Sequence, residues 1–171
     1  MKLELKPWRI EDAERLADVF NRSDRSYTSN RRPTPYPVEA ARTWLEAIQE
    51  KEGKDGLFCA ILVDGAYEGF ITVEREEDVH CLDAEIGYLV TKEVESKGIA
   101  TWAVGELTKR AFEELDIVRL TAFIFAENLA SKRVLEKNNY VLEGVLKQSL
   151  YKNGKIQDEC IYASYRPESL K

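Results

Sequence analysis

The sequence predicts a single domain of mixed α and β structure over residues 1–171. Three observations support this prediction. The chain has the length of one domain that can bury a sizeable core. Segments whose apolar residues have helical periodicity alternate with segments typical of strands. Two dipeptides that favour tight hairpin turns, Asp64-Gly65 and Asn153-Gly154, each stand between strand-like segments.

Four segments have the apolar spacing of amphipathic helices. The predicted helices cover about residues 10–20, 38–48, 103–115 and 129–137. The segment Arg31–Pro37 lies between the first two and holds three prolines within five positions. Because proline fixes φ and lacks an N–H donor, this segment is predicted to be a stiff surface loop.

Six further segments are rich in β-branched and aromatic residues or alternate in polarity. The predicted strands cover about residues 57–63, 66–75, 81–90, 118–125, 141–151 and 157–165. The first pair and the last pair are predicted hairpins, because each is separated by one of the two turn dipeptides. The run Val118–Phe125 is nearly continuous in apolar residues, which indicates a strand buried on both faces.

The most informative segment joins the predicted strand ending at Val90 to the predicted helix that covers about residues 103–115. A short loop between them carries Gly98. Backbone N–H groups at a helix N-terminus lack intrahelical partners and lie at the positive end of the helix dipole. The loop formed by Ser96, Lys97, Gly98, Ile99 and Ala100 is therefore predicted to bind a phosphate group.

Charge and composition exclude several classes of function. The net charge is −6, and the acidic excess lies after residue 57, which disfavours nucleic acid as the main partner. No apolar run approaches the roughly 20 residues of a membrane span, and the N-terminus lacks a signal-peptide pattern, so a cytoplasmic protein without membrane contact is expected. One histidine and no paired-cysteine spacing predict no metal site. The acidic run Glu74–Asp78 is either a solvated turn or an attractor for a cationic ligand.

The order of these elements, together with local motifs, resembles the GNAT (Gcn5-related) N-acetyltransferases. That family's pyrophosphate loop has the pattern Gln/Arg-x-x-Gly-x-Gly/Ala, and Glu95-Ser-Lys-Gly98-Ile-Ala100 matches it except at the first position. Seven segments resemble the Rim-type branch in the same order and spacing, a branch that acetylates protein N-termini such as those of ribosomal proteins. They are Glu85-Ile-Gly-Tyr88, Gly98-Ile-Ala-Thr101, Ala111-Phe-Glu-Glu-Leu115, Glu127-Asn128 with Ser131, Arg133-Val-Leu-Glu-Lys137, Leu142-Glu-Gly-Val145 and Tyr151-Lys-Asn-Gly154.

The resemblance implies the α/β GNAT (acyl-CoA N-acyltransferase) fold. In this fold a twisted, mostly antiparallel mixed sheet carries helices on both faces and splays near Val90, so that the pantetheine arm enters between strands. The implied function is transfer of an acetyl group from acetyl-CoA to a primary amine by direct attack in a ternary complex. The first choice of acceptor is a protein N-terminal α-amine. The alternatives are a polyamine, an amino acid or an aminoglycoside, and, in another class, a non-catalytic acyl-CoA-binding regulator. Whether the protein forms a homodimer is left undecided by the sequence.

The resemblance also assigns the donor site. The pyrophosphate binds at the loop formed by Ser96, Lys97, Gly98, Ile99, Ala100 and Thr101. The backbone N–H of Leu89 or Val90 polarises the thioester carbonyl, provided that a bulge opens the strand there. Asn128, a predicted N-cap, contacts the pantetheine arm. Ser131 lies near the sulfur and is expected to donate a hydrogen bond to the departing thiolate.

On the acceptor side, Glu85 is the candidate catalytic base, because it shares a strand face with Gly87 and Leu89. The alternative is a structural carboxylate that holds a neighbouring backbone group or an arginine. The resemblance implies that the acceptor groove is walled by Arg31–Pro37, the helix after it and the hairpin around Asn153-Gly154. We expect the acidic run at 74–78 to lie too far away to take part.

Three positions depart from the family pattern. Glu95 replaces Gln or Arg, and we expect its carboxylate to point away from the pyrophosphate. Ser96 stands where the branch commonly has glycine. Leu135 replaces the tyrosine that protonates the thiolate in many GNAT enzymes, so that proton must come from another group or from water.

Overall fold

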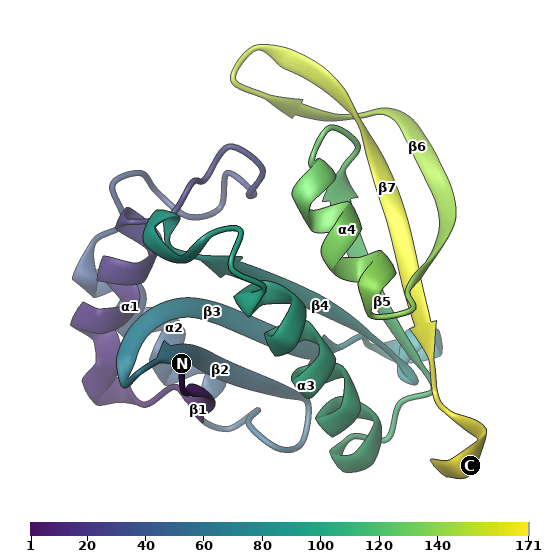
Figure 1. Ribbon diagram of the computed structural model, residues 1–171, viewed down its shortest axis with the longest axis horizontal. Coiled ribbons are helices and arrows are strands. Elements are labelled where there is room, and N and C mark those ends of the chain that lie inside the picture. Colours follow the sequence, from purple (N-terminus) through teal and green to yellow (C-terminus); the bar gives the residue numbers. More distant parts are fainter. Residues whose placement is uncertain (171) are drawn as a thin grey trace.

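The computed structural model describes residues 1–170 and consists of one seven-stranded sheet with helices on both faces (Figure 1). The strand order is β1-β2-β3-β4-β5-β7-β6. The strands are β1 (Leu3–Pro7), β2 (Gly56–Val63), β3 (Ala66–Arg75), β4 (Asp83–Val90), β5 (Arg119–Phe125), β6 (Val141–Lys152) and β7 (Lys155–Tyr165). The helices are α1 (Ala13–Asn21), α2 (Val38–Ile48), α3 (Ile99–Glu114) and α4 (Leu129–Lys137), with short 3-10 turns between some elements. All neighbouring strands are antiparallel except β4 and β5.

All predicted helices and strands are present, with their ends shifted by a few residues. The structure adds β1, which the sequence analysis did not predict. This strand has only two inward-facing apolar residues, Leu3 and Leu5, before Pro7. Its register with β2, from Leu3 opposite Val63 to Pro7 opposite Cys59, comes from a long-range pairing. Such a pairing leaves little local signal.

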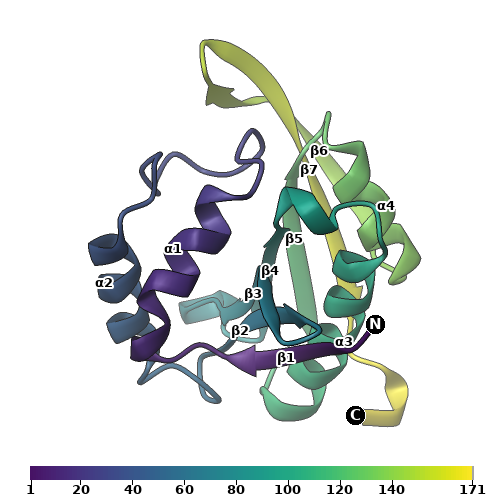
Figure 2. The same ribbon diagram turned by 60° about the vertical axis from the view of Figure 1, so that its left-hand side comes forward.

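The sheet separates two hydrophobic clusters (Figure 2). One cluster lies beneath α1 and α2 and includes Leu16, Phe20, Leu45 and Phe58. The other lies beneath α3 and α4. It contains the fully buried side chains Ile61, Ile71, Leu107, Leu120 and Leu135, among others. Strand β2 is buried along nearly its whole length because both faces are covered by helices.

Both predicted hairpin turns are confirmed. The two central residues of the β2–β3 turn have positive φ, 49° at Asp64 and 85° at Gly65. The β6–β7 turn has φ of 52° at Asn153 and 76° at Gly154. Two positive φ values are what a type I′ turn requires, and asparagine, aspartate and glycine adopt them at low cost. Local chemistry therefore determines both hairpins.

Strands β4 and β5 are paired only at their beginnings. The parallel register runs from Asp83 opposite Arg119 to Glu85 opposite Thr121 and then stops. At this junction the Thr121 hydroxyl donates to Asp83 Oδ1 at 2.8 Å, and Arg119 forms an ion pair with Asp83. Beyond Glu85 the strands diverge, so the splay begins about five residues earlier than predicted near Val90. Figure 1 shows β4 diverging from β5 and β7 beyond this junction.

Candidate active site

The splay opens into a cleft of about 520 Å³ between the two halves of the sheet. Strands β3, β4 and β5 form its floor, and α4, the α1–α2 loop and the end of β6 form its sides. The lining includes the predicted site residues Glu85, Leu89, Asn128 and Ser131. Residues that lie far apart in the sequence are therefore brought together here.

The predicted phosphate loop precedes α3 and is shaped for close approach of a ligand backbone or anion. Gly98 is the N-cap of α3 with φ of 78°, and a Cβ built there would meet nothing within 4 Å. The first turn of α3 contains no acidic residue, and no side chain caps it within the described chain. The first intrahelical bond that we find runs from Trp102 N–H to Gly98 O at 3.0 Å, so the N–H groups of residues 99–101 precede it. Anion binding is the expected property of such a terminus.

Exposure within this loop differs by residue. Ser96, Lys97 and Gly98 are exposed, Ala100 and Thr101 are half-buried, and Ile99 is buried in the core. Ser96 has φ of 61°, a left-handed conformation that favours glycine. This conformation explains why the branch commonly carries glycine here. Glu95 is exposed, as expected for a carboxylate that points away from the site.

Strand β4 differs from the prediction in one respect, because no bulge interrupts it. Its register with β3 is regular from Ala84 through Val90. The Glu76 N–H donates to Asp83 O and the Thr91 N–H donates to Glu68 O, both at 2.9 Å. In a regular antiparallel ladder these bonds fix which N–H groups face β3. The N–H of Leu89 faces β3, whereas that of Val90 faces the space between β4 and β5. The splay itself therefore frees the Val90 donor, and no bulge is needed.

Asn128, Ser131 and Tyr88 meet on the α4 side of the cleft. Asn128 is the N-cap of α4, and its Oδ1 accepts a 3.2 Å hydrogen bond from Ser131 N, so the capping prediction is confirmed. Ser131 Oγ lies 2.8 Å from the hydroxyl oxygen of Tyr88. Burial raises the pKa of Tyr88 to about 12, and the hydrogen bond to Ser131 only partly offsets this effect. Leu135 is fully buried in the core and faces no ligand.

Tyr88 is a polar residue of the cleft to which the sequence analysis assigned no role. Its partner Ser131 is 43 residues away in the chain. The spacing of neither residue indicates the pair, which forms only because α4 packs across β4. The motif Glu85-Ile-Gly-Tyr88 was the one available signal, since it places two polar side chains on opposite faces of one strand.

Glu85 lies at the opposite side of β4 from Tyr88, with its side chain accessible to solvent. Loss of hydration in the cleft wall raises its pKa, and the nearby carboxylates of Glu76 and Glu159 raise it further. Among residues 1–170, Glu85 has no hydrogen bond or ion pair of its side chain. The structural alternative, a carboxylate that holds a backbone group or an arginine, therefore lacks the contact it requires.

Other carboxylates around the cleft are not equivalent. Glu74 lines the cleft, which corrects the expectation that the whole acidic run lies too far away. Its carboxylate is already bonded to Lys51 Nζ at 2.6 Å. Asp158 is outside the lining and is bonded to Lys147 and to Gln148 N. Glu159 lines the cleft, and burial raises its pKa.

The acceptor-side walls also need correction. The lining residues of the α1–α2 loop are Tyr27, Thr28, Ser29, Asn30 and Arg32, so the wall begins before the proline-rich segment. Tyr36 of that segment is instead buried, with its backbone held by Asn21. Helix α2 contributes no lining residue. The hairpin contributes Leu150, Tyr151 and Lys152, which confirms that part of the prediction.

The hairpin and the loop are in direct contact across the cleft. Lys152 Nζ donates to the carbonyl oxygens of Arg25, at 2.6 Å, and of Thr28. The ring of Tyr27 packs against Phe125 with their centroids 5.5 Å apart. These contacts join the N-terminal loop to the C-terminal half of the sheet and bridge the acceptor side of the cleft.

Two further features, a metal-binding cluster and a membrane-spanning helix, are absent from the part of the chain that the structure describes. Within residues 1–170, no cluster of three or more histidine, cysteine, aspartate or glutamate side chains could hold a metal ion. None of the helices in that range is both long and apolar enough to cross a membrane.

Comparisons with known proteins identify the family. Residues 2–141 match the model of the acetyltransferase (GNAT) domain. The chain is 32% identical over 162 residues to the protein named "Putative ribosomal N-acetyltransferase YdaF" of Bacillus subtilis (strain 168), covering 92% of this chain and 87% of the relative.

Two solved structures share the fold at low identity. The ribosomal-protein-S5-alanine acetyltransferase from Vibrio fischeri superposes with a TM-score of 0.87 at 20% identity, covering 98% of this chain and 95% of that one. RimL, described as a ribosomal L7/L12 alpha-N-protein acetyltransferase in complex with coenzyme A, superposes with a TM-score of 0.82 at 20% identity, covering 96% and 94%. The chain belongs to the GNAT family and is an acetyltransferase enzyme, as its resemblance to that family predicted.

Proposed function

We propose that this enzyme transfers an acetyl group from acetyl-CoA to the N-terminal α-amine of a protein, as a member of the Rim-type branch. The main observation in support of this proposal is the arrangement of the cleft around β4. Asn128 and Ser131 line its α4 side, and the phosphate loop, which is outside the lining, leads into α3. Glu85 and the loop at 27–32 lie on the acceptor side. Donor and acceptor can thus approach one strand from opposite sides, as direct attack in a ternary complex requires.

The donor site follows from this arrangement. The pyrophosphate binds the N–H groups of the loop at 96–101, and Lys97 adds a positive charge. The pantetheine arm passes Asn128 and Ser131. The Val90 N–H donates to the thioester oxygen and stabilises the negative charge that develops there. Leu89 contributes its side chain to the cleft wall.

The chemical step needs one proton removed and one supplied. Glu85 accepts a proton from the acceptor amine, directly or through water, and the amine nitrogen attacks the thioester carbon. The carbon–sulfur bond then breaks, and the nitrogen passes its second proton to the departing thiolate, directly or through water, which gives the amide and free CoA. Ser131 donates a hydrogen bond to the departing thiolate, and the hydroxyl of Tyr88 supports Ser131 from 2.8 Å. An α-amine has an unperturbed pKa of about 7.7–8.0, which is close to neutral pH, so a weak base is sufficient to deprotonate it.

The charges around the cleft support a peptide N-terminus over a polyamine. Of the three carboxylates in the lining, Glu74 is already paired with Lys51, which leaves Glu85 and Glu159. Arg32 and Lys152 also line the cleft and disfavour a ligand with several positive charges. The polar residues Thr28, Ser29 and Asn30 offer partners for a peptide backbone. The names of YdaF and RimL point to the same acceptor class.

A small amine is the second candidate, because Glu85 and Glu159 lie in one cleft, where the negative charge of Glu159 raises the pKa of Glu85 and the two carboxylates together attract a cation. The cytoplasmic location and the homodimer remain predictions from the sequence.

Competition kinetics test the proposal. Thiol release from acetyl-CoA would be measured with short peptides bearing free N-termini, the same peptides with blocked N-termini, spermidine, free amino acids and an aminoglycoside. We expect the free peptides to have the highest kcat/KM and the blocked peptides to be inactive. Turnover of spermidine or an aminoglycoside above about 10⁴ M⁻¹s⁻¹, with no peptide acetylated, would overturn the peptide assignment.

A further inference from the structure

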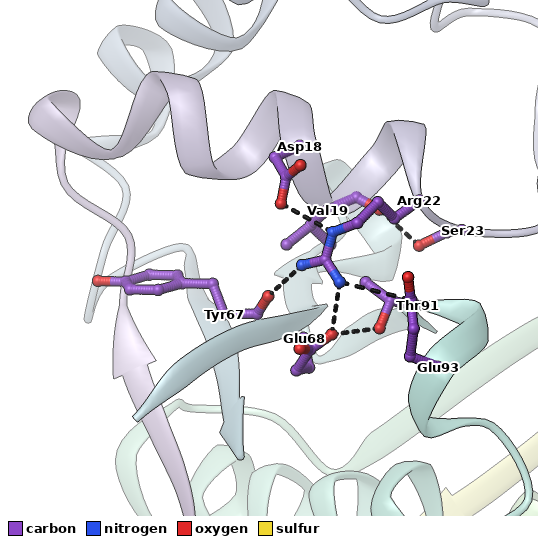
Figure 3. Close-up of polar contacts among 8 residues, drawn as sticks. All are labelled: Asp18, Val19, Arg22, Ser23, Tyr67, Glu68, Thr91 and Glu93. Carbon is purple, nitrogen blue, oxygen red and sulfur yellow. Dashed lines mark hydrogen bonds and ion pairs between the residues drawn. The ribbon is translucent and has the colours of Figure 1, made fainter. Parts of the chain in front are cut away.

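Arg22, directly after α1, is the centre of a polar cluster outside the cleft (Figure 3). Its guanidinium donates to Asp18 Oδ2, Glu68 Oε2 and the carbonyl oxygen of Tyr67, each at 2.8 Å. It also contacts Glu93 Oε2 at 3.4 Å. One side chain therefore connects the end of α1, the beginning of β3 and the segment after β4.

Glu68 reaches this cluster because β3 contains a bulge. In the β2–β3 register, Ile61 lies opposite Gly69 and Leu62 lies opposite Tyr67, so Glu68 has no partner on β2. A bulge of this kind re-aims a side chain. The Glu68 side chain is 16% exposed, so its negative charge is largely withdrawn from water. A carboxylate in such a place needs a cation and hydrogen-bond donors.

Thr91 is the second partner of Glu68. Thr91 is completely buried and donates from its hydroxyl to Glu68 Oε2 and from its N–H to Glu68 O. Thr91 also forms an isolated antiparallel β-bridge with Ser23. Next to it, the Lys92 N–H donates to the carbonyl oxygen of Arg22 at 3.1 Å. The chain immediately after β4 is thus held by both backbone and side-chain bonds.

This held segment leads into the phosphate loop. The 3-10 turn Lys92–Val94 follows Thr91, and the four residues 95–98 connect this turn to α3. Val94 is buried, but residues 95–98 are exposed and have few contacts of their own. Their position therefore depends on how the preceding segment is anchored. The same Arg22 also precedes the loop at 27–32 that lines the acceptor side.

We infer that Arg22, Glu68 and Thr91 are positioning residues that hold the phosphate loop in the geometry needed for the pyrophosphate of acetyl-CoA. None of them lines the cleft. The inference rests on the proposed donor site. According to this inference, the ion pair between Arg22 and Glu68 affects only the binding of the nucleotide half of acetyl-CoA. It does not affect the binding of the pantetheine arm or the chemical step.

The test compares two acyl donors in the Arg22→Gln protein. Acetyl-CoA carries the pyrophosphate and acetyl-pantetheine does not, and kcat/KM can be measured for each without saturation. We expect kcat/KM for acetyl-CoA to fall at least tenfold and that for acetyl-pantetheine to change less than twofold. Calorimetry without acceptor should show a matching rise of at least tenfold in the Kd of CoA.

Glu68→Gln is the second variant, because it keeps the side-chain size and removes only the charge, and we expect the same pattern from it. Arg15→Gln is the matched control. It removes an arginine of α1 that pairs with Asp12, the residue just before that helix, with no contact to the segment after β4, and should leave kcat/KM for both donors unchanged. Melting temperatures of all three proteins separate loss of folding from loss of positioning.

Equal losses for the two donors in both cluster variants, or no loss for either donor, would overturn the inference. A separate result bears on the donor site itself. If a bulky substitution at Gly98 leaves the affinity for CoA unchanged, the donor site is misplaced. If that substitution weakens CoA binding and the Arg22 and Glu68 variants do not, only the positioning role is wrong.

Discussion

The two halves of the sheet are built differently. Strands β1 to β4 form an antiparallel ladder, interrupted by one bulge in β3, that helices cover on both faces, and seven of the eight residues of β2 are buried. Strand β6, at the other edge, is mostly exposed and carries Val141, Leu142, Val145 and Leu146 with 41–51% of their surfaces accessible. The first half supplies a rigid base, and the second supplies a more open wall. The candidate active site lies at the seam, where three residues of parallel pairing join them.

This contrast has a functional consequence. A catalytic strand needs fixed geometry, and β4 obtains it from regular pairing with β3 on one side. A binding wall needs access, which the C-terminal hairpin offers because its outer strand, β6, is mostly exposed. Four predictions test or sharpen the comparison, from the largest expected effect to the smallest.

The largest contrast is in stability. Ile71 of β3 is completely buried in the cluster beneath α3, whereas Leu146 of β6 is 42% exposed. We expect Ile71→Ala to lower the free energy of unfolding by about 2–5 kcal/mol, because it leaves a cavity. Leu146→Ala should lower it by less than about 1 kcal/mol. Urea unfolding of both proteins measures the difference, and equal losses would contradict the view that the halves are built differently.

Glu85→Gln tests the catalytic base on the rigid strand. We expect kcat/KM to fall about 10- to 100-fold at pH 6.5, where most of the acceptor amine is protonated, and the loss to shrink as pH rises past the amine's pKa. The measurement is a pH profile of acetyl transfer for both proteins. An equal loss at every pH would indicate a structural role, and no loss would remove Glu85 from the mechanism.

Gly98→Val tests the phosphate loop. We expect the Kd for acetyl-CoA, measured by calorimetry, to rise at least tenfold, which is about 1.4 kcal/mol. The added side chain would occupy space that is open in the protein, and valine disfavours the φ of 78°. Gly65→Val is the matched control, because Gly65 has φ of 85° and open space in the β2–β3 turn, and Gly65 does not line the cleft. It should lose stability to a similar degree without losing affinity.

The smallest effect concerns the coupling between carboxylates across the seam. Burial raises the pKa of Glu85, and the charge of Glu159 on β7 raises it further. A base must be deprotonated, so a raised pKa moves the acid limb of the pH profile to higher pH. Glu159→Gln removes one negative charge and should shift this limb to lower pH by less than about one unit. The control Glu113→Gln, on the exposed face of α3, should not shift it.

Local chemistry predicted most of the fold. The positive φ values at Asp64-Gly65 and Asn153-Gly154 follow from residue types that tolerate them, so both hairpins could be read from the sequence. The helices follow from apolar periodicity, and Gly98 indicated that a helix begins after it, where α3 begins in the structure. Strand β1 escaped prediction because only its pairing with β2 identifies it.

By itself the sequence determined the helices, the hairpins, the glycine-bearing loop before α3 and the family resemblance, because each depends on residues that are neighbours in the chain. Tertiary structure alone decided which distant residues meet. It brought Ser131 to Tyr88 across 43 positions and Arg22 to Glu68 across 46. It also paired Glu74 with Lys51, which left Glu85 and Glu159 as the free carboxylates of the cleft among the described residues. The physical reason is that a charge or hydroxyl takes its chemical character from the partners and burial that packing provides, and spacing along the chain encodes neither.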